Sequence, residues 1–318
     1  MIQKQHSTPD CCAKKKSCIS LIDYSEEEIV HLLTMAGDLK KKRGSNENRI
    51  MCNKTGVMIF EKPSLRTHIS FETALYELGG NAILLPSNMV QMGKRESVKD
   101  VAKNLERLVH LIIARTYLHE TIVELDTQSS IPVINALSDK FHPCQALAFA
   151  LTIREHCGQD KKIKAVFVGD GNNVCNSLMV ICAKLGHDFV VACPKGYEPE
   201  NKIVEVCRTI AAKNGSGIEL TNNPYNCVKD ASVIYTDVWA SMGQENEAEK
   251  RKKHFEKYQV NDALLKLAPS DVLVSHCLPA HRGEEITDEV LESSHSIALD
   301  EAENRLHVQK AVIVHLFS

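Results

Sequence analysis

Residues Thr55–Gly80, which read TGVMIFEKPSLRTHISFETALYELGG, decide the fold of the first half of this chain. The apolar run Gly56–Phe60 has the length of a buried strand, and Pro63 ends it. Ser64 is a favourable helix N-cap residue. The apolar residues that follow at helical spacing are Leu65, Ile69, Phe71, Leu75 and Leu78. A glycine pair then stops the helix, so the stretch predicts a strand, a short loop and a helix.

The first turn of that helix gathers groups that bind anions. Free backbone N–H groups, the positive end of the helix dipole, the Arg66 guanidinium and the hydroxyls of Ser64 and Thr67 converge there. Phosphate is the anion that fits this set best. The alternative is an ordinary capped surface helix with a solvated arginine, because helix N-termini are common and phosphate ligands are not. This stretch alone leaves both interpretations open.

The composition is that of an ordinary globular protein. Of 318 residues, 43% are hydrophobic and 25% are charged, and the length suits two domains. The net charge of −3 gives no reason to expect nucleic acid or an anionic membrane as a partner, and no apolar run approaches the roughly 20 residues of a membrane helix. Twelve cysteines scattered through apolar segments, with no signal peptide, indicate free thiols in the cytoplasm. Residues 1–18 are expected to form a disordered leader.

Strands alternate with helices through the rest of the chain. A serine-capped helix begins at Ser25 with acids in its first turn, and Pro143 fits the first position of a later helix. Further strands are predicted at 83–86, 110–115, 131–137, 163–168, 189–193, 231–236 and 272–275. A charged, solvated helix is predicted at 245–257 and a closing helix at 302–317. We therefore predict an α/β fold with two parallel-sheet domains that divide near residues 144–156.

Ligands of open parallel sheets bind beyond the carboxyl ends of the strands. The polar residues predicted just there are Arg115, His142, Asn173, Asp237 and Cys277. The rule therefore predicts that ligands bind near these residues.

Two other kinds of site are weaker matches. The turn at Gly169–Val174 suggests a dinucleotide site, but valine stands at the third glycine position and Cys193-Pro194 follows the next strand where an acidic residue is needed. A tight turn is the simpler reading. His276, Cys277 and His281 could suggest a metal, but zinc would need further ligands at known spacing.

Five motifs in order give the chain a family resemblance. They are Ser64–His68 (SLRTH), His142–Gln145 (HPCQ), Asp237–Gly243 (DVWASMG), His276–Pro279 (HCLP) and Glu301–Arg305 (EAENR). Together they resemble the transcarbamylases, and among them the ornithine carbamoyltransferases. The resemblance implies transfer of a carbamoyl group from carbamoyl phosphate to the δ-amino group of L-ornithine, giving L-citrulline and phosphate in arginine metabolism. It implies no cofactor, no metal and no covalent intermediate.

The same resemblance implies the architecture. A carbamoyl-phosphate-binding domain is expected at 19–145 with 300–318, and an ornithine-binding domain at 146–299, with the C-terminal helix returning to the first domain. The family is trimeric, so a homotrimer or a multiple of trimers is expected, with Gln91 of a neighbouring subunit completing each phosphate site.

The resemblance also implies the site residues. The expected catalytic residues are Arg66, Thr67, Arg115, His142, Cys277 and Arg305. The expected carbamoyl-phosphate ligands are these together with Ser64, Leu65, Gln91, Gln145 and Leu278. The expected ornithine ligands are Asn173, Asp237, Ser241 and Met242.

One departure and two alternatives accompany this reading. His68 stands where the family usually has a second arginine, one helical turn after Ser64, so it is expected to support the phosphate site from outside. A neutral histidine there would weaken the local positive charge and could make binding pH-dependent. The alternatives are a transcarbamylase that uses putrescine or an N-acylornithine, and an inactive scaffolding paralogue.

Overall fold

Two parallel β-sheets form the framework of the protein. The computed structural model describes residues 16–45, 48–86, 89, 92–93, 95–159, 161–240 and 245–318. In the first sheet the strand order is β2-β1-β3-β4, with β1 at Thr55–Phe60, β2 at Asn81–Pro86, β3 at Leu111–Arg115 and β4 at Val133–Leu137. In the second the order is β7-β6-β5-β8-β9, with β5 at Lys164–Val168, β6 at Asp188–Ala192, β7 at Ile218–Thr221, β8 at Val233–Thr236 and β9 at Leu273–His276.

Helices connect the strands and cover both sheets. In the first half they are α1 (Glu26–Lys41), α2 (Leu65–Glu77), α4 (Val98–Leu108), α5 (His119–Gln128) and α6 (Pro143–Cys157). In the second they are α7 (Asn173–Lys184), α8 (Asn201–Lys213), α9 (Pro224–Cys227), α10 (Ala248–Phe255), α11 (Asp262–Leu265), α12 (Asp288–Leu291) and α13 (Ala298–Phe317). Short 3₁₀ turns at Glu245–Glu247 and Glu256–Tyr258 flank α10. The predicted α/β class with two parallel sheets is confirmed.

Local sequence signals place the helix starts. Ser25 forms a complete capping box, because its Oγ accepts from the Glu28 N–H at 3.1 Å and its own N–H donates to the Glu28 carboxylate at 2.9 Å. Ser64 caps α2 through a 3.3 Å bond from the Thr67 N–H to its Oγ. Pro143 occupies the start of α6. All three starts agree with the sequence prediction.

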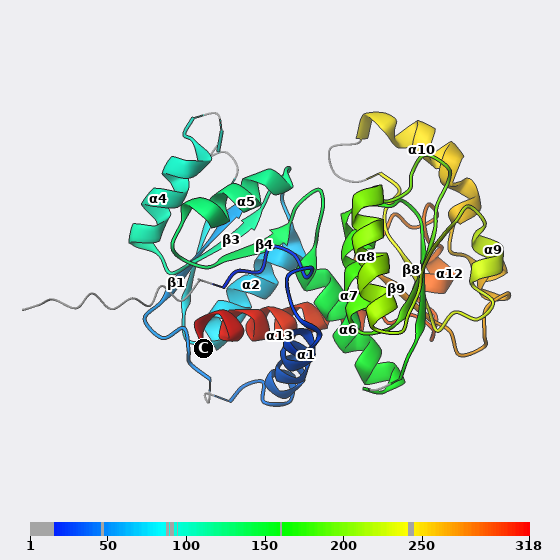
Figure 1. The fold of residues 1–318 in the computed structure, drawn as a ribbon, viewed down its shortest axis with the longest axis horizontal. Helices are drawn as coiled ribbons and strands as arrows, with labels where there is room; N and C mark the ends of the chain where they lie inside the picture. The colour runs from blue at the N-terminus through cyan, green and yellow to red at the C-terminus, as the bar shows by residue number, and fades with distance from the viewer. Residues whose placement is uncertain are drawn as a thin grey trace, which may run out of the picture.

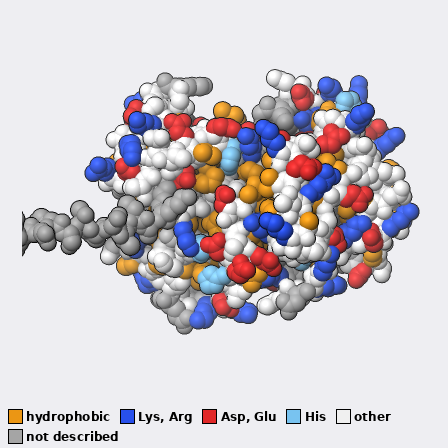
Figure 2. Space-filling model, in the orientation of Figure 1, with side chains coloured by type: hydrophobic (Ala, Val, Ile, Leu, Met, Phe, Trp, Pro, Cys, Tyr) orange, Lys and Arg blue, Asp and Glu red, His pale blue; other side chains and the backbone are white. Residues whose placement is uncertain are grey.

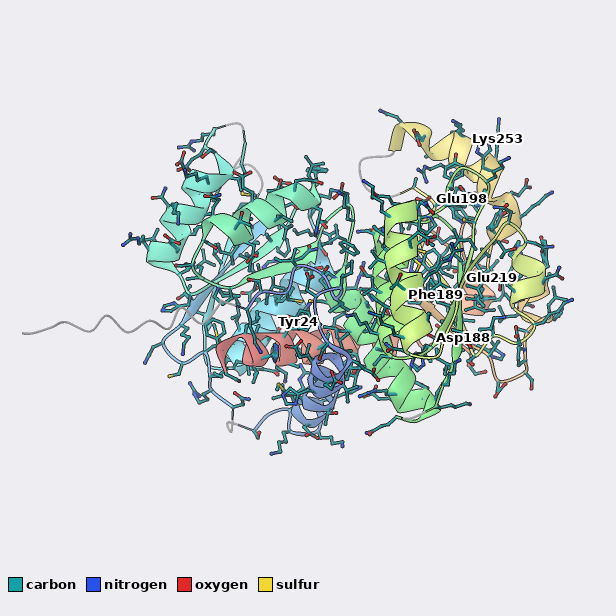
Figure 3. The ribbon with its side chains drawn as sticks, in the orientation of Figure 1. Tyr24, Asp188, Phe189, Glu198, Glu219 and Lys253 are labelled. Carbon is teal, nitrogen blue, oxygen red and sulfur yellow. The ribbon has the colours of Figure 1, made fainter. Side chains whose placement is uncertain are left out.

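The helix α13 returns to the first half of the chain. It packs against α1, α2 and α6, and α6 in turn packs against α7 of the second half (Figure 1). Near its end, the His315 ring lies 5.9 Å from the ring of Tyr24, which Figure 3 labels beside α1. Because α6 is buried along most of its length, α6 and α13 bury apolar surface between the two sheets.

The structure differs from the sequence analysis, or adds to it, at three places. Leu65 and Ile69 of α2 are 70% and 53% exposed, so the helical spacing is correct but these two side chains do not reach the core. The edge strand β7 was not predicted from the sequence, because it is short and only Ile218 in it is buried. The helix after residue 245 is not simply a solvated face, since Arg251 and Phe255 of α10 are buried.

The surface mixes charges of both signs. On the face shown in Figure 2, hydrophobic side chains gather over the junction between the two halves. Among the described residues, no helix is both long and apolar enough to cross a membrane.

Candidate active site

A cavity of about 1300 Å³ opens between the carboxyl ends of the two sheets. Its walls come from both halves of the chain, at the strand ends where ligands of parallel sheets bind. The predicted site residues that line it are Ser64, Leu65, Arg66, Thr67, Arg115, His142, Gln145, Asn173, Asp237, Cys277, Leu278 and Arg305. The predicted Gln91, Ser241 and Met242 lie outside the described residues. The structure therefore brings together every predicted site residue that it describes.

One end of the cavity is the N-terminus of α2. The Ser64 hydroxyl donates to the Thr67 hydroxyl at 2.9 Å, and Thr67 also accepts from Arg305 Nη2 at 3.2 Å. Thr67 is buried although polar. The capped helix end therefore presents hydroxyls, and the helix dipole adds a partial positive charge.

Three guanidinium groups surround this helix end. Arg66 lies in the first turn of α2, Arg115 ends β3, and Arg305 comes from α13. Burial, together with the nearby charges of Arg305 and Arg66, lowers the pKa of Arg115 to about 10, while Cys277 acts to raise it. Arg305 is buried, and its guanidinium donates to the Gln145 amide oxygen at 2.5 Å and to the Thr67 hydroxyl at 3.2 Å. Such clustered positive charge favours an anionic ligand.

His142 lies beside the arginines as the N-cap of α6. It is buried, and its backbone N–H donates to the Ser177 hydroxyl at 2.7 Å. Burial, with the charges of Arg305 and Arg115, holds the pKa of His142 well below its usual value. The imidazole is therefore neutral near pH 7, and its Nδ1 has no hydrogen-bond partner among the described residues. A neutral imidazole can donate one N–H to a ligand in the cavity.

The opposite end of the cavity joins β8 and β9. The Cys277 thiol donates to Asp237 Oδ1 at 2.8 Å, and Asn172 Nδ2 donates to Asp237 Oδ2 at 2.7 Å. Burial and the Asp237 charge hold the pKa of Cys277 well above its usual value. Cys277 is thus a thiol rather than a thiolate, and Asp237 supplies the negative charge at this end.

The loop after β9 is held by His276. Its Nε2 lies 3.1 Å from Glu285 Oε1, and its Nδ1 accepts from the Leu278 N–H at 2.8 Å. Leu278 has a φ of +53° and precedes a cis peptide bond to Pro279. Both imidazole nitrogens of His276 and the Cys277 thiol therefore have hydrogen-bond partners within the loop and its surroundings.

The glycine-rich turn after β5 serves chain packing. A Cβ on Gly171 would lie 2.3 Å from the Pro199 nitrogen, so only glycine fits there. Asn172 caps α7 by accepting from the N–H groups of Val174 and Cys175 at 3.0 and 3.1 Å. Asn173 faces the cavity and donates to the Ser138 carbonyl at 2.6 Å. These contacts give the glycine and asparagines of the turn a structural role.

His68 takes no direct part in the cavity lining. Its Nε2 pairs with Glu72 at 3.0 Å on the same helix, and its ring meets the edge of Phe60. The position agrees with the expectation that His68 supports the site from outside.

Sequence reasoning missed three features of this site. Gln145 is engaged at both ends of its amide, by Arg305 at Oε1 and by Glu301 at Nε2. Arg251 of α10 reaches the cavity wall and pairs with Asp170 at 2.9 Å. The only signal for Glu301 was the Glu301–Arg305 motif, and no sequence pattern pointed to Asp170 and Arg251.

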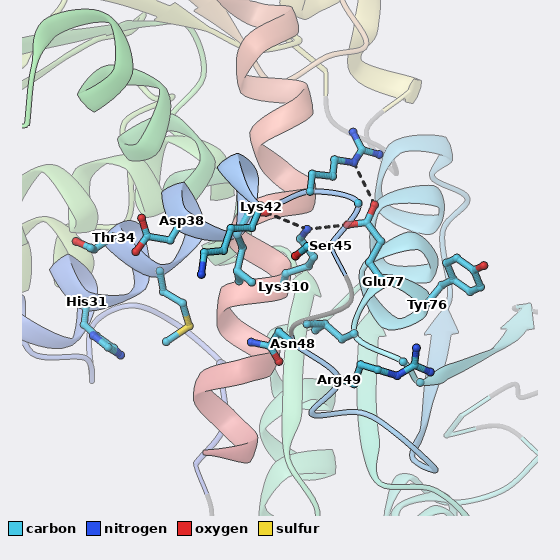
Figure 4. A pocket seen from close by; sticks show the side chains of 17 residues that line it. His31, Thr34, Asp38, Lys42, Ser45, Asn48, Arg49, Tyr76, Glu77 and Lys310 are labelled. Carbon is cyan, nitrogen blue, oxygen red and sulfur yellow. Dashed lines mark hydrogen bonds and ion pairs between the residues drawn. The ribbon is translucent and has the colours of Figure 1, made fainter.

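A second cavity of about 870 Å³ lies elsewhere, between α1, the end of α2 and α13 (Figure 4). Glu77 lies in its wall and accepts from both Lys310 at 2.6 Å and Arg43 at 3.1 Å. None of the predicted site residues lines it.

Comparison with known proteins gives consistent results over nearly the whole chain. Residues 16–155 match the family described as aspartate/ornithine carbamoyltransferase, carbamoyl-P binding domain, and residues 161–316 match its Asp/Orn binding domain. The chain is 51% identical over 305 residues to an ornithine carbamoyltransferase of Pyrococcus horikoshii, covering 95% of this chain and 96% of that protein. A relative from Pyrococcus furiosus, named as an anabolic ornithine carbamoyltransferase, is 50% identical over 94% of this chain and 95% of its own length.

Solved structures agree with the sequence comparison. The ornithine carbamoyltransferase from Pyrococcus furiosus superposes with a TM-score of 0.91 at 50% identity, covering 94% of this chain and 96% of that one. The anabolic enzyme from Campylobacter jejuni gives a TM-score of 0.90 at 39% identity, covering 95% and 98%. The similarity thus extends over both halves of the chain.

Proposed function

The chain belongs to the aspartate/ornithine carbamoyltransferase family, and we propose that it transfers the carbamoyl group of carbamoyl phosphate to the δ-amino group of L-ornithine. The products are L-citrulline and phosphate. One observation carries the proposal: a single cavity has clustered arginines at one end and the Asp237–Cys277 pair at the other. An anionic donor and a cationic amino acid would meet between them.

The phosphate end provides charge and orientation. Backbone N–H groups at the start of α2, the hydroxyls of Ser64 and Thr67 and the Arg66 guanidinium seat the phosphate. Leu65 contributes its backbone N–H. Arg305 extends the positive wall from the opposite side.

The carbonyl is activated by donors aimed at its oxygen. Thr67, Arg115 and His142 stabilise the negative charge that develops when the amine attacks and the planar carbon becomes tetrahedral. His142 acts as a neutral donor because its pKa is held low. Gln145 and the Leu278 carbonyl orient the carbamoyl NH₂. As the tetrahedral intermediate collapses, the bond from carbon to the phosphate oxygen breaks.

The amino acid is held from the second half. Asp237 accepts from the α-ammonium, and Asn173 binds the α-amino-acid group. Ser241 and Met242, which lie outside the described residues, are proposed to bind the same group. The δ-amine must lose a proton to attack, since its free pKa is near the lysine value of about 10.4. The neutral Cys277 thiol adds no negative charge that would favour the ammonium form. The departing phosphate takes the proton.

The assembly and location follow the family. We take residues 19–145 with 300–318 as the carbamoyl-phosphate domain and 146–299 as the ornithine domain, which agrees with the packing of α13 on α1 and α2. A homotrimer in the cytoplasm, with Gln91 from a neighbour at each phosphate site, completes the proposal. Association between subunits is supported by exposed apolar side chains on α2 and β2, namely Leu65, Ile69, Tyr76, Ile83 and Leu84.

An amine-acceptor panel tests the function. Purified protein with carbamoyl phosphate is offered L-ornithine, N-acetylornithine, putrescine or aspartate, and the ureido product is measured by a colour test. Product with L-ornithine should far exceed that with putrescine, because putrescine has no α-amino-acid group for Asp237 and Asn173 to bind. A preference for putrescine or N-acetylornithine would indicate a sibling transcarbamylase, and no product with any amine would indicate an inactive scaffold.

A further inference from the structure

Glu301 is a buried carboxylate at the centre of the molecule. Its side chain is 0% exposed and receives three hydrogen bonds from three elements. Gln145 Nε2 of α6 donates to Oε1 at 2.5 Å, the Tyr235 hydroxyl of β8 donates to Oε1 at 2.7 Å, and the Ser275 hydroxyl of β9 donates to Oε2 at 2.5 Å. A charged group with this many partners fixes the positions of all of them.

The residues that bind Glu301 connect it to both ends of the cavity. Toward the phosphate end, Gln145 Oε1 accepts from Arg305 at 2.5 Å, and Arg305 donates to Thr67 at 3.2 Å. Toward the amino-acid end, Asp237 follows the last residue of β8, which contains Tyr235, and Cys277 follows the last residue of β9, which contains Ser275. All three donors to the Glu301 carboxylate are protein side chains, so its role does not depend on contact with a substrate.

We propose that Glu301 is a positioning residue whose ionised carboxylate holds the two substrate sites in register, across the junction between the two halves. The proposal rests on the carbamoyl-transfer function proposed above. Glu301 fixes the Gln145 amide so that its oxygen faces Arg305, and it fixes the strand ends that present Asp237 and Cys277.

The ionised form is the one that the geometry fits. A protonated carboxyl would have to donate to Ser275 or Tyr235, which reverses one of the three bonds. The charged and titratable groups that face Glu301 are Arg305 on its own helix, Tyr235 on β8 and Cys277 after β9. Burial raises the pKa of Glu301 to about 7, although its hydrogen bonds and Arg305 act to lower it. Its charge therefore changes near neutral pH.

The test compares Glu301→Gln with the wild type over a range of pH. Glutamine keeps the size and mimics the protonated acid, so the two proteins should have similar kcat/KM well below pH 7. As pH rises through about 7, the wild type should gain over the variant by about 10- to 100-fold, the effect of a lost hydrogen bond to a charged group. Taking this ratio cancels the titration of the substrates. Glu303→Gln is the matched control, since Glu303 lies two residues on in α13 with a half-exposed side chain.

A second variant tests the role of the Glu301 carboxylate without replacing it. The hydrogen bond from Ser275 lowers the pKa of Glu301, so Ser275→Ala should move the midpoint of the activity rise to higher pH. This variant keeps the test decisive if Glu301→Gln does not fold, which circular dichroism would reveal.

The outcomes separate the two proposals. No citrulline from the wild type would refute the function itself. If the wild type is active, a wild-type to Glu301→Gln ratio that is constant with pH would refute the positioning role, since a purely structural defect would not follow the charge. An unchanged midpoint in Ser275→Ala would refute it as well.

Discussion

Replacing Arg251 with methionine tests how α10 is held against the cavity wall. Arg251 is 6% exposed and Asp170 is 7% exposed, and Arg251 Nη1 donates to both the Asp170 carboxylate and the Trp239 carbonyl at 2.9 Å. The guanidinium also lies over the Tyr197 ring, 4.9 Å from its centroid. Arg251→Met removes all of these contacts and leaves a buried carboxylate without its counter-charge.

The size of the loss depends on pH. Burial raises the pKa of Asp170 from 3.8 to about 6, even though Arg251 lowers it. The folded protein therefore binds this proton more tightly than the unfolded chain, so the stability from protonated Asp170 is lost as pH rises through about 6. Without Arg251, the Asp170 carboxyl stays protonated to higher pH. The free energy of unfolding of the variant therefore decreases relative to that of the wild type by about 1.4 kcal/mol for each pH unit above about 6.

At about pH 7.5 the electrostatic part of the loss is about 2 kcal/mol. The lost bond to the Trp239 carbonyl adds about 1 kcal/mol, and the lost ring contact with Tyr197 adds up to about 1 kcal/mol. We therefore expect Arg251→Met to lower the free energy of unfolding by about 3–4 kcal/mol at that pH, and by about half as much at pH 5.

Urea denaturation at one protein concentration and two pH values measures this. Arg251→Met with Asp170→Asn should lose the pH dependence, because the titrating carboxyl is gone. Arg208→Met is the surface control: its pair with Glu205 is half exposed and should contribute less than about 1 kcal/mol. An equal loss for Arg251→Met at both pH values would show that Asp170 does not carry the effect.

Three further predictions concern single positions. Arg66→Ala should reduce kcat/KM in the citrulline assay by about 100-fold or more, because it removes one of the guanidiniums at the phosphate end; near-normal turnover would refute that site. Gln309→Leu should raise the free energy of unfolding in urea by about 1 kcal/mol, since neither end of this buried amide has a partner among the described residues; a loss would reveal a hidden partner. His68→Arg should change the KM for carbamoyl phosphate by less than about threefold, because the side chain points to Glu72 outside the cavity; a tenfold change would contradict this.

Local features of the fold were predictable because they depend on a few neighbouring residues. The helix starts at Ser25, Ser64 and Pro143 are set by capping within one turn, and the structure has all three. Periodicity indicated where α2 runs, but it could not say which apolar residues meet the core. Leu65 and Ile69 are exposed because their side of α2 has no packing partner within the described chain.

Some features of the candidate site could likewise be predicted from the sequence, and others could not. The topological rule that ligands bind at strand ends correctly placed Arg115, Asp237 and Cys277 around one cavity. The contact between Gln145 and Glu301 joins residues 156 positions apart, and no spacing in the sequence encodes it. Such pairs depend on how α6 and α13 pack, which is a tertiary property.

Two buried carboxyls beside the cavity, Asp170 and Glu301, have pKa values raised by burial. Each therefore costs the folded protein stability when it ionises, and apolar residues of similar size often serve stability equally well or better. Each also bonds to groups that shape the cavity: Asp170 to Arg251, and Glu301 to Gln145. Buried carboxyls that lower stability when they ionise, and that lie at one site rather than throughout the core, indicate a function at that site. Neutralising Glu301 should therefore have effects of opposite sign above pH 7, weakening catalysis while relieving the cost of a buried charge.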